Sequence, residues 1–113
     1  MMRESLADNS LHADMIITPS NGADMQYRRP SSAYTRTNGH GDSYAAPAWV
    51  KLVREGDVIT GYKSTDGVTW EQDDQITNPM SSTIYIGLVV TSHNDGVLAT
   101  AVFDSVSVTS SGP

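Results

Sequence analysis

The sequence predicts an all-β protein, an antiparallel sandwich of two sheets. Short runs rich in β-branched and aromatic residues recur along the chain, separated by turn signals that contain Gly, Asn or Pro. No stretch repeats its apolar residues with the 3.6-residue period of a helix over a dozen positions. With 113 residues, the chain is long enough for one core, so we expect a single domain, 1–113.

The middle of the chain shows the strand pattern most clearly. Trp49 to Arg54 and Val58 to Ser64 are predicted strands, and the Gly-containing turn Glu55-Gly56-Asp57 joins them. Asp66-Gly67 is a hairpin dipeptide, after which Val68 to Trp70 opens a third run. We therefore expect an antiparallel meander here.

Three further strands are predicted before this meander, and a long loop follows them. The runs are Met1 to Leu6, His12 to Thr18 and Ala23 to Arg29, and the Asn21-Gly22 turn pairs the second with the third. Residues 30–47 are rich in Ser, Gly, Pro and Asn, and only 34–37 could form a brief strand. A loop of this length in a compact domain is usually functional or mobile.

The C-terminal third predicts the remaining strands. A polar connection, Glu71 to Met80, contains a brief strand at Gln75 to Thr77. Ile84 to Thr91 is apolar on both faces, which is typical of a strand buried in the middle of a sandwich. Val97 to Thr109 is a long last strand whose alternation slips near Asp104-Ser105, where we expect a β-bulge.

Composition limits the classes of partner. The chain has seven Lys and Arg residues and thirteen Asp and Glu residues, and the resulting net charge of -6 disfavours binding to nucleic acid. Cysteine is absent, which excludes disulfides, thiolate zinc sites and a cysteine nucleophile. No run reaches the ~20 apolar residues of a membrane span. The N-terminus lacks the apolar core of a signal peptide, so we expect either a cytoplasmic protein or a mature or truncated piece of an exported one.

Four blocks of the sequence resemble a known family. They are MMRESL, HADMIITPSNGADMQYRR, APAWVKLVREGDVITGYKSTDGVTWEQ and YIGLVVTSHNDGVLATAVFDSVSV. In this order they are similar to the concanavalin A-like jelly-roll domains of large secreted bacterial proteins, in a group of domains of unknown function with a "regulation of enolase"-like label. The resemblance implies a jelly-roll sandwich and an extracellular or cell-surface location.

The same resemblance implies a truncated sandwich. Such domains usually carry several strands before the MxRESL block, and this sequence lacks them. The remaining strands would then leave an apolar face and an unpaired sheet edge, which proteins normally cover. We therefore expect a homodimer, or a higher closed oligomer, formed through that edge or face.

The aromatic residues indicate a carbohydrate partner. Seven of the eight are Tyr or Trp, whose flat rings stack on sugars while their polar atoms reach hydroxyl groups. We expect Trp70 and Tyr85 to pack in the core. The candidate binding residues lie near the long loop and in the Ser92 to Gly96 turn, and they are Tyr27, Arg28, Arg29, Tyr34, Tyr44, Trp49, His93 and Asn94.

Two turns offer both a structural and a functional interpretation. Ser92 to Gly96 uses ordinary hairpin residues, but its amide and carboxylate also suit sugar hydroxyls or calcium, with Asn94, Asp95 and Asp104 as ligands. A metal site that uses some of His12, His40 and His93 is a further alternative. Ser64 to Trp70 resembles an Asp box, and we expect a turn in which Asp66 caps its own backbone, Gly67 takes a positive φ and Trp70 packs below.

The most favoured function is non-catalytic carbohydrate binding, as a module of an exported carbohydrate-active or cell-surface protein. One alternative is a small polysaccharide-active enzyme that uses groove carboxylates or a bound metal, and another is a structural or association module. The ExDxxE strand of related glucanases is absent, as are the GxSxG and HExxH motifs. Several carboxylates could pair across strands, although no spacing singles out two of them: Glu4, Asp14, Asp24, Glu71, Asp73 and Asp74.

Overall fold

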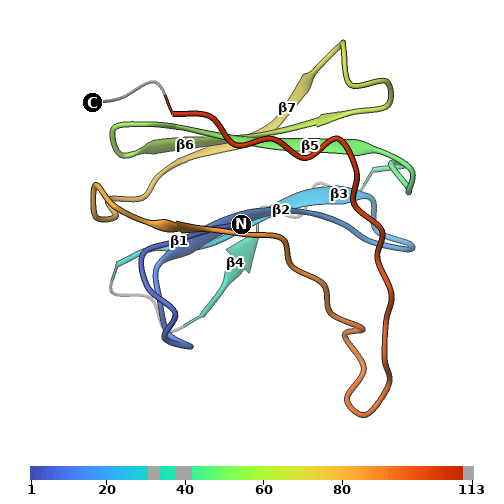
Figure 1. The fold of residues 1–113 in the computed structure, drawn as a ribbon, viewed down its shortest axis with the longest axis horizontal. Helices are drawn as coiled ribbons and strands as arrows, with labels where there is room; N and C mark the ends of the chain where they lie inside the picture. Colours follow the sequence, from blue (N-terminus) through green and yellow to red (C-terminus); the bar gives the residue numbers. More distant parts are fainter. Residues whose placement is uncertain (31–33, 38–41, 111–113) are drawn as a thin grey trace.

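The computed structural model describes residues 1–30, 34–37 and 42–110, in which it has eight strands and no helix (Figure 1). The strands are β1 (Met2–Arg3), β2 (His12–Ile17), β3 (Ala23–Arg28), β4 (Arg36–Thr37), β5 (Trp49–Glu55), β6 (Val58–Ser64), β7 (Glu71–Thr77) and β8 (Tyr85–Ile86). Five form one sheet in the order β4-β3-β2-β1-β8, and three form a second in the order β5-β6-β7. All pairs are antiparallel. The predicted all-β class is confirmed, and the two stacked layers are consistent with a β-sandwich (Figure 1).

Local turn chemistry accounts for the two main hairpins. Gly22 adopts a φ of 79°, and its carbonyl accepts a hydrogen bond from the Thr18 amide at 2.9 Å, which closes the β2–β3 turn. Gly56, with a φ of 61°, closes the β5–β6 turn. Both turns lie where the sequence predicts them, because a positive φ strongly favours glycine.

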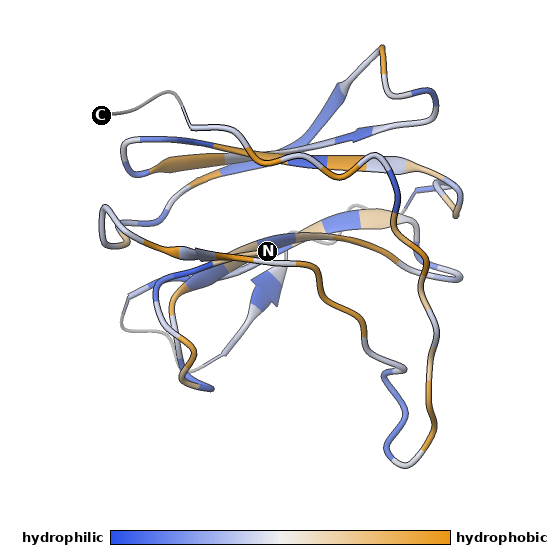
Figure 2. Cartoon of the chain, viewed as in Figure 1, coloured by the Kyte–Doolittle hydropathy of each residue, from blue (hydrophilic) through white to orange (hydrophobic). Residues whose placement is uncertain are grey.

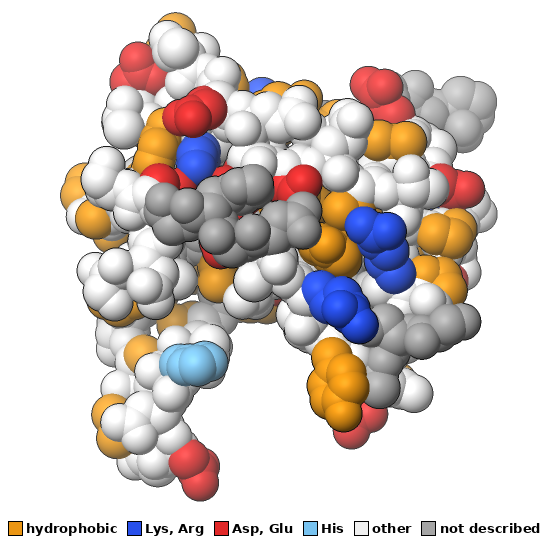
Figure 3. Space-filling model, turned by 180° about the vertical axis from the view of Figure 1, so that it is seen from behind, with side chains coloured by type: hydrophobic (Ala, Val, Ile, Leu, Met, Phe, Trp, Pro, Cys, Tyr) orange, Lys and Arg blue, Asp and Glu red, His pale blue; other side chains and the backbone are white. Residues whose placement is uncertain are grey.

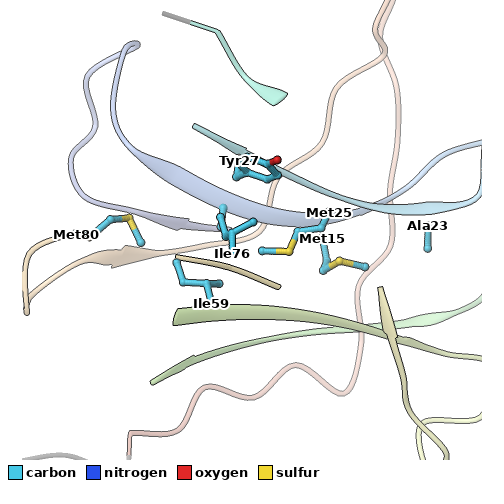
Figure 4. Close-up of a cluster of buried hydrophobic side chains, with 8 residues drawn as sticks. Met15, Ala23, Met25, Tyr27, Ile59, Ile76 and Met80 are labelled. Atoms are coloured by element: carbon cyan, nitrogen blue, oxygen red, sulfur yellow. The ribbon is translucent and has the colours of Figure 1, made fainter. Parts of the chain in front are cut away.

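The core lies between the two sheets (Figure 4). Met15 and Met25 on one sheet point toward Ile59 and Ile76 on the other. Gly61 allows this approach, since a Cβ atom there would lie 2.6 Å from the Met15 sulfur and 3.0 Å from the Met25 sulfur. A larger residue at position 61 would force the layers or the methionine side chains apart.

The C-terminal strand predictions are wrong. Of Ile84 to Thr91, only Tyr85–Ile86 forms a strand, and it pairs with β1 alone at the edge of the sheet. Val97 to Thr109 forms no strand, so the bulge expected at Asp104-Ser105 has no ladder to interrupt. The physical reason is that a strand needs a neighbour to accept its backbone hydrogen bonds. Here β8 pairs only with the short β1, and β5 remains an edge strand of the other sheet.

Two other boundaries differ from the predictions. Val68 to Trp70 belongs to the turn region rather than to a strand, because the Asp66 carboxylate accepts hydrogen bonds from the Val68 and Thr69 amides. The last strand of the meander is β7, which is longer than the predicted Gln75 to Thr77. Within the predicted loop 30–47, the brief strand expected in 34–37 is present as β4.

Candidate functional site

The outward side of the three-stranded sheet carries an aromatic surface, which we define as Trp49, Lys51, Tyr62 and Trp70. Side chains alternate along a strand, and Gly61 and Lys63 of β6 face the other sheet. Tyr62 therefore faces outward, as does Lys51, its partner on β5. The Lys51 ammonium lies 4.8 Å from the centroid of the Tyr62 ring and 4.3 Å from that of Trp70.

The Ser64–Trp70 turn orders one end of this surface. Asp66 Oδ1 accepts hydrogen bonds from the Val68 and Thr69 amides at 2.8 and 2.9 Å, and these amides hold the pKa of Asp66 below its usual value. Gly67 has a φ of 75°, and a Cβ atom there would lie 2.7 Å from the Trp49 ring. The prediction for Asp66 and Gly67 is confirmed, but Trp49 packs against Gly67, where Trp70 was expected.

The aromatic surface has the chemistry to hold a sugar. Trp49 is 38% exposed and Trp70 and Tyr62 are partly exposed, so their rings remain open to a ligand. Indole and phenol rings stack on the C–H faces of sugars. The Lys51 ammonium, held above two rings by cation–π attraction, can donate hydrogen bonds to hydroxyl groups. The expectation that Trp70 and Tyr85 pack in the core is therefore wrong, since Tyr85 is also exposed, at 54%.

A second group of polar side chains lies on the outward face of the five-stranded sheet. His12 pairs with Arg28 on β3 and with Arg3 on β1, and Asp14 lies two residues along from His12. His12 and Asp14 are only 5% and 4% exposed. Within the described residues, His12 Nδ1, Asp14 Oδ1 and Arg28 Nε lack a hydrogen-bond partner. Burial and the two nearby arginines lower the pKa of His12 to about 4, whereas burial raises the pKa of Asp14 to about 6.

Among the described residues, Asp14 and Asp24 form a carboxylate pair on this face that can be compared with a hydrolase site. Asp14 pairs with Gln26, so Asp24 is its diagonal neighbour on the same face, at roughly 7–8 Å. A carboxyl group with a raised pKa beside a second carboxyl group is the pattern of a general acid and its partner. However, Asp14 is 4% exposed, so a glycosidic oxygen has no direct access to it in this structure.

His12 and Asp14 predict opposite pH dependences of stability. Because folding raises the pKa of Asp14 from 3.8 to about 6, its stabilising contribution is present below pH 3.8 and is lost as the pH rises through 6. Folding lowers the pKa of His12 from 6.5 to about 4, so its contribution is present above pH 6.5 and is lost as the pH falls through 4. The two effects, each on the order of 3 kcal/mol, nearly cancel in the native protein.

Single substitutions should separate these two contributions. In Asp14→Asn, the free energy of unfolding should rise between pH 4 and 6.5, because only the contribution of His12 remains. In His12→Asn it should fall between pH 3.8 and 6, because only the contribution of Asp14 remains. Urea unfolding at several pH values measures both slopes, and equal slopes in the two variants would contradict the assignment.

Sequence reasoning missed a buried ion cluster formed by Asp42, Lys63 and Asp73. The Lys63 ammonium bonds both carboxylates, with a distance of 3.0 Å to Asp73 Oδ1. Asp42 also accepts bonds from the Ala23 and Tyr44 amides, and Asp73 from the Met25 amide. Burial lowers the pKa of Lys63, but the hydrogen bonds from Asp42 and Asp73 outweigh it and raise that pKa above its usual value.

The inward direction of Lys63 could have been predicted from the sequence, but that of Asp73 could not. Lys63 has the same parity as Ile59 and Gly61 in the predicted strand, so alternation alone places it inward. Asp73 faces inward because of a bulge, since Gly61 pairs with Asp74 and Tyr62 with Gln72. A bulge of this kind leaves no clear mark in the sequence.

The structure does not bring the predicted sugar-binding residues together. Tyr27 is a core residue, 5% exposed, and the next residue, Arg28, points to the opposite face. Arg29 lies 5.0 Å from the centroid of the Tyr27 ring. Tyr44 lies beside Lys63, and its hydroxyl donates to Glu71. Tyr34 is exposed beside β4, so of the predicted residues only Trp49 belongs to the aromatic surface.

The Ser92–Gly96 turn, with His93 and Asn94, lies in the long loop after β8. His93 and Gly96 have φ values of 56° and 81°, and the Asn94 carbonyl accepts the Val97 amide at 3.0 Å, as in a tight turn. Among the described residues, no three His, Asp or Glu side chains are grouped so that they could hold a metal ion. Calcium binding by Asn94, Asp95 and Asp104 remains a prediction, and His40 lies outside the described residues.

Comparison of the chain with models of known protein families, with curated proteins and with solved structures finds no match. The described part of the chain also contains no helix long and apolar enough to cross a membrane.

Proposed function

We propose that this chain is a non-catalytic carbohydrate-binding module that holds a glycan on the aromatic surface. The observation that carries this proposal is that Trp49, Tyr62 and Trp70 lie with Lys51 on one solvent-facing side of the three-stranded sheet. Stacking on rings, with one ammonium donor, suits a chain of sugar units. A net charge of -6 repels polyanions, which favours a neutral polysaccharide.

The proposed setting is an exported carbohydrate-active or cell-surface protein. Support comes from the four sequence blocks that resemble concanavalin A-like jelly-roll domains and from the two-layer antiparallel fold. Association of copies of the chain is part of the proposal, and its surface is argued in the next subsection. The burial of Asp14 favours binding over hydrolysis.

Alanine at Trp49 or at Trp70 should weaken binding by on the order of 1 to 3 kcal/mol, because each ring loses its contact area with the sugar. Calorimetric titration against a panel of neutral soluble polysaccharides measures the change. Tyr34→Ala is the matched control, since Tyr34 is an exposed aromatic residue of the other sheet's loop region, 74% exposed. Thermal unfolding checks that each variant folds.

Unchanged affinity in both tryptophan variants would contradict the proposed surface. If Tyr34→Ala lost affinity instead, the result would indicate that the glycan binds at the five-stranded sheet. Assaying the same panel for new reducing ends tests the enzymatic alternative. Sugar release that disappears in Asp14→Asn would favour hydrolysis over binding.

A further inference from the structure

The chain after β7 carries most of the exposed apolar surface. Of the sixteen large apolar side chains exposed among the described residues, eleven lie between Tyr85 and Val108, which we call the C-terminal apolar segment. Leu98 is 98% exposed and Val102 is 90% exposed. Figure 2 shows hydrophobic residues along this segment although most of it belongs to neither sheet. Water contact over so large an apolar area is unfavourable and marks an interaction surface.

The backbone of this segment also makes few hydrogen bonds to other backbone groups. Apart from β8, the backbone hydrogen bonds of the described residues 87–109 are those between Gly87 and Met1 and the one from the Val97 amide to the Asn94 carbonyl. Yet Ile84 to Thr91 and Val97 to Thr109 have the composition of strands. In Figure 1 the first part of this segment projects beyond the sheets, and its last part returns beside β5. In Figure 3 the projecting part forms one of two projections that flank a hollow. Unpaired strand-forming segments readily bond another strand.

The sandwich is open where this segment leaves it. The five-stranded sheet, with β1 and β8 at one end, faces a sheet of only three strands whose edge is β5. An open cavity of about 860 Å³ lies there, lined by residues that include Met2, Leu52, Ile84, Ile86 and Val108. Apolar side chains of both layers therefore line this opening, and the chain's own Val108 to Ser110 lie beside it without pairing with β5 as a strand.

We infer that the C-terminal apolar segment is the interface between two copies of this chain, paired as strands about a two-fold axis. Between Tyr85 and Val108 there is no Lys or Arg, and the only acidic residues are Asp95 and Asp104. The segment thus offers a charged partner little attraction, and it keeps most of the -6 charge of each copy away from the interface. A second copy supplies the same apolar, strand-forming segment, which makes the surface self-complementary, as a two-fold interface requires.

Sedimentation velocity and light scattering at micromolar concentration test this interface. The native chain should have twice the 12.2 kDa mass of one copy. The double variant Leu98→Lys/Val102→Lys should have the mass of one copy, because it places charges at the pairing surface. Val68→Lys should remain dimeric, since Val68 is equally exposed, at 80%, but lies in the Ser64–Trp70 turn. Circular dichroism checks that each variant folds.

Hydrogen exchange distinguishes pairing between copies from closure within one chain. Amides of residues 97–108 should be protected in the dimer and should lose protection on dilution. A native chain that is monomeric at every concentration overturns the proposal, as does a dimer unaffected by Leu98→Lys/Val102→Lys. Protection that does not change with concentration also overturns it. The result is independent of glycan binding, which the Trp49 and Trp70 variants report separately.

Discussion

Replacing Lys63 with Met should lower the free energy of unfolding by about 3 to 5 kcal/mol. The substitution removes the only described cation bonded to both Asp42 and Asp73. The Asp73 side chain is 1% exposed, so its charge would be left between the sheets without a counter-ion. Burying an unpaired charge costs far more than the packing that methionine restores. Urea unfolding measures the change.

Two further variants separate the buried charge from general effects of losing a lysine. Lys51→Met removes a lysine from the outward face of β5, and we expect a loss below about 1 kcal/mol, as for an exposed cation–π contact. The triple variant Asp42→Asn/Lys63→Met/Asp73→Asn removes all three charges and should recover part of the loss. If Lys63→Met and Lys51→Met were equally stable, the buried ion cluster would not stabilise the fold as described.

Met25→Ala should lower the free energy of unfolding by about 2 to 5 kcal/mol, the range for emptying a buried site of this size. Met25 is fully buried, and its sulfur lies against Gly61 of the opposite sheet. The cavity would form where the two layers approach most closely, so neither layer can relax into it without moving the other. Thermal and urea unfolding measure the loss.

The matched control is Met25→Leu, which nearly conserves volume and should cost less than about 1.5 kcal/mol. Similar losses in Met25→Ala and Met25→Leu would show that position 25 is sensitive to side-chain shape rather than to volume. Similar stability of Met25→Ala and the native chain would contradict the placement of Met25 in the core.

The parts of the fold that depend on local chemistry were predictable from the sequence. Val58 to Ser64 is a strand over the whole predicted range, and the His12 and Ala23 runs form the expected hairpin. Gly22 and Gly67 take the positive φ values that their turns require. Asp66 caps the amides that follow it. Each of these features is determined by residues within a few positions of one another, so the order of the chain contains the necessary information.

The site depended on contacts between distant segments. Trp49, not Trp70, covers Gly67, because the β5–β6 register places Trp49 beside the Ser64–Trp70 turn. The aromatic composition indicated a sugar as the binding partner, but it did not identify the binding residues. The strand register brings Lys51, Tyr62 and Trp70 together and places Tyr27 in the core. Register and layer pairing are set by which faces bury best against each other.

What the sequence by itself determined is therefore the all-β class, most strand positions and the turn residues. Only the tertiary structure decided which strand-forming segments are paired, as the failure of Ile84 to Thr91 and Val97 to Thr109 shows. These segments have strand composition, yet beyond Tyr85–Ile86 neither pairs with an edge of the described sheets. Strand propensity is a property of a segment, whereas a strand exists only with a partner, because its backbone donors and acceptors are satisfied from outside the segment.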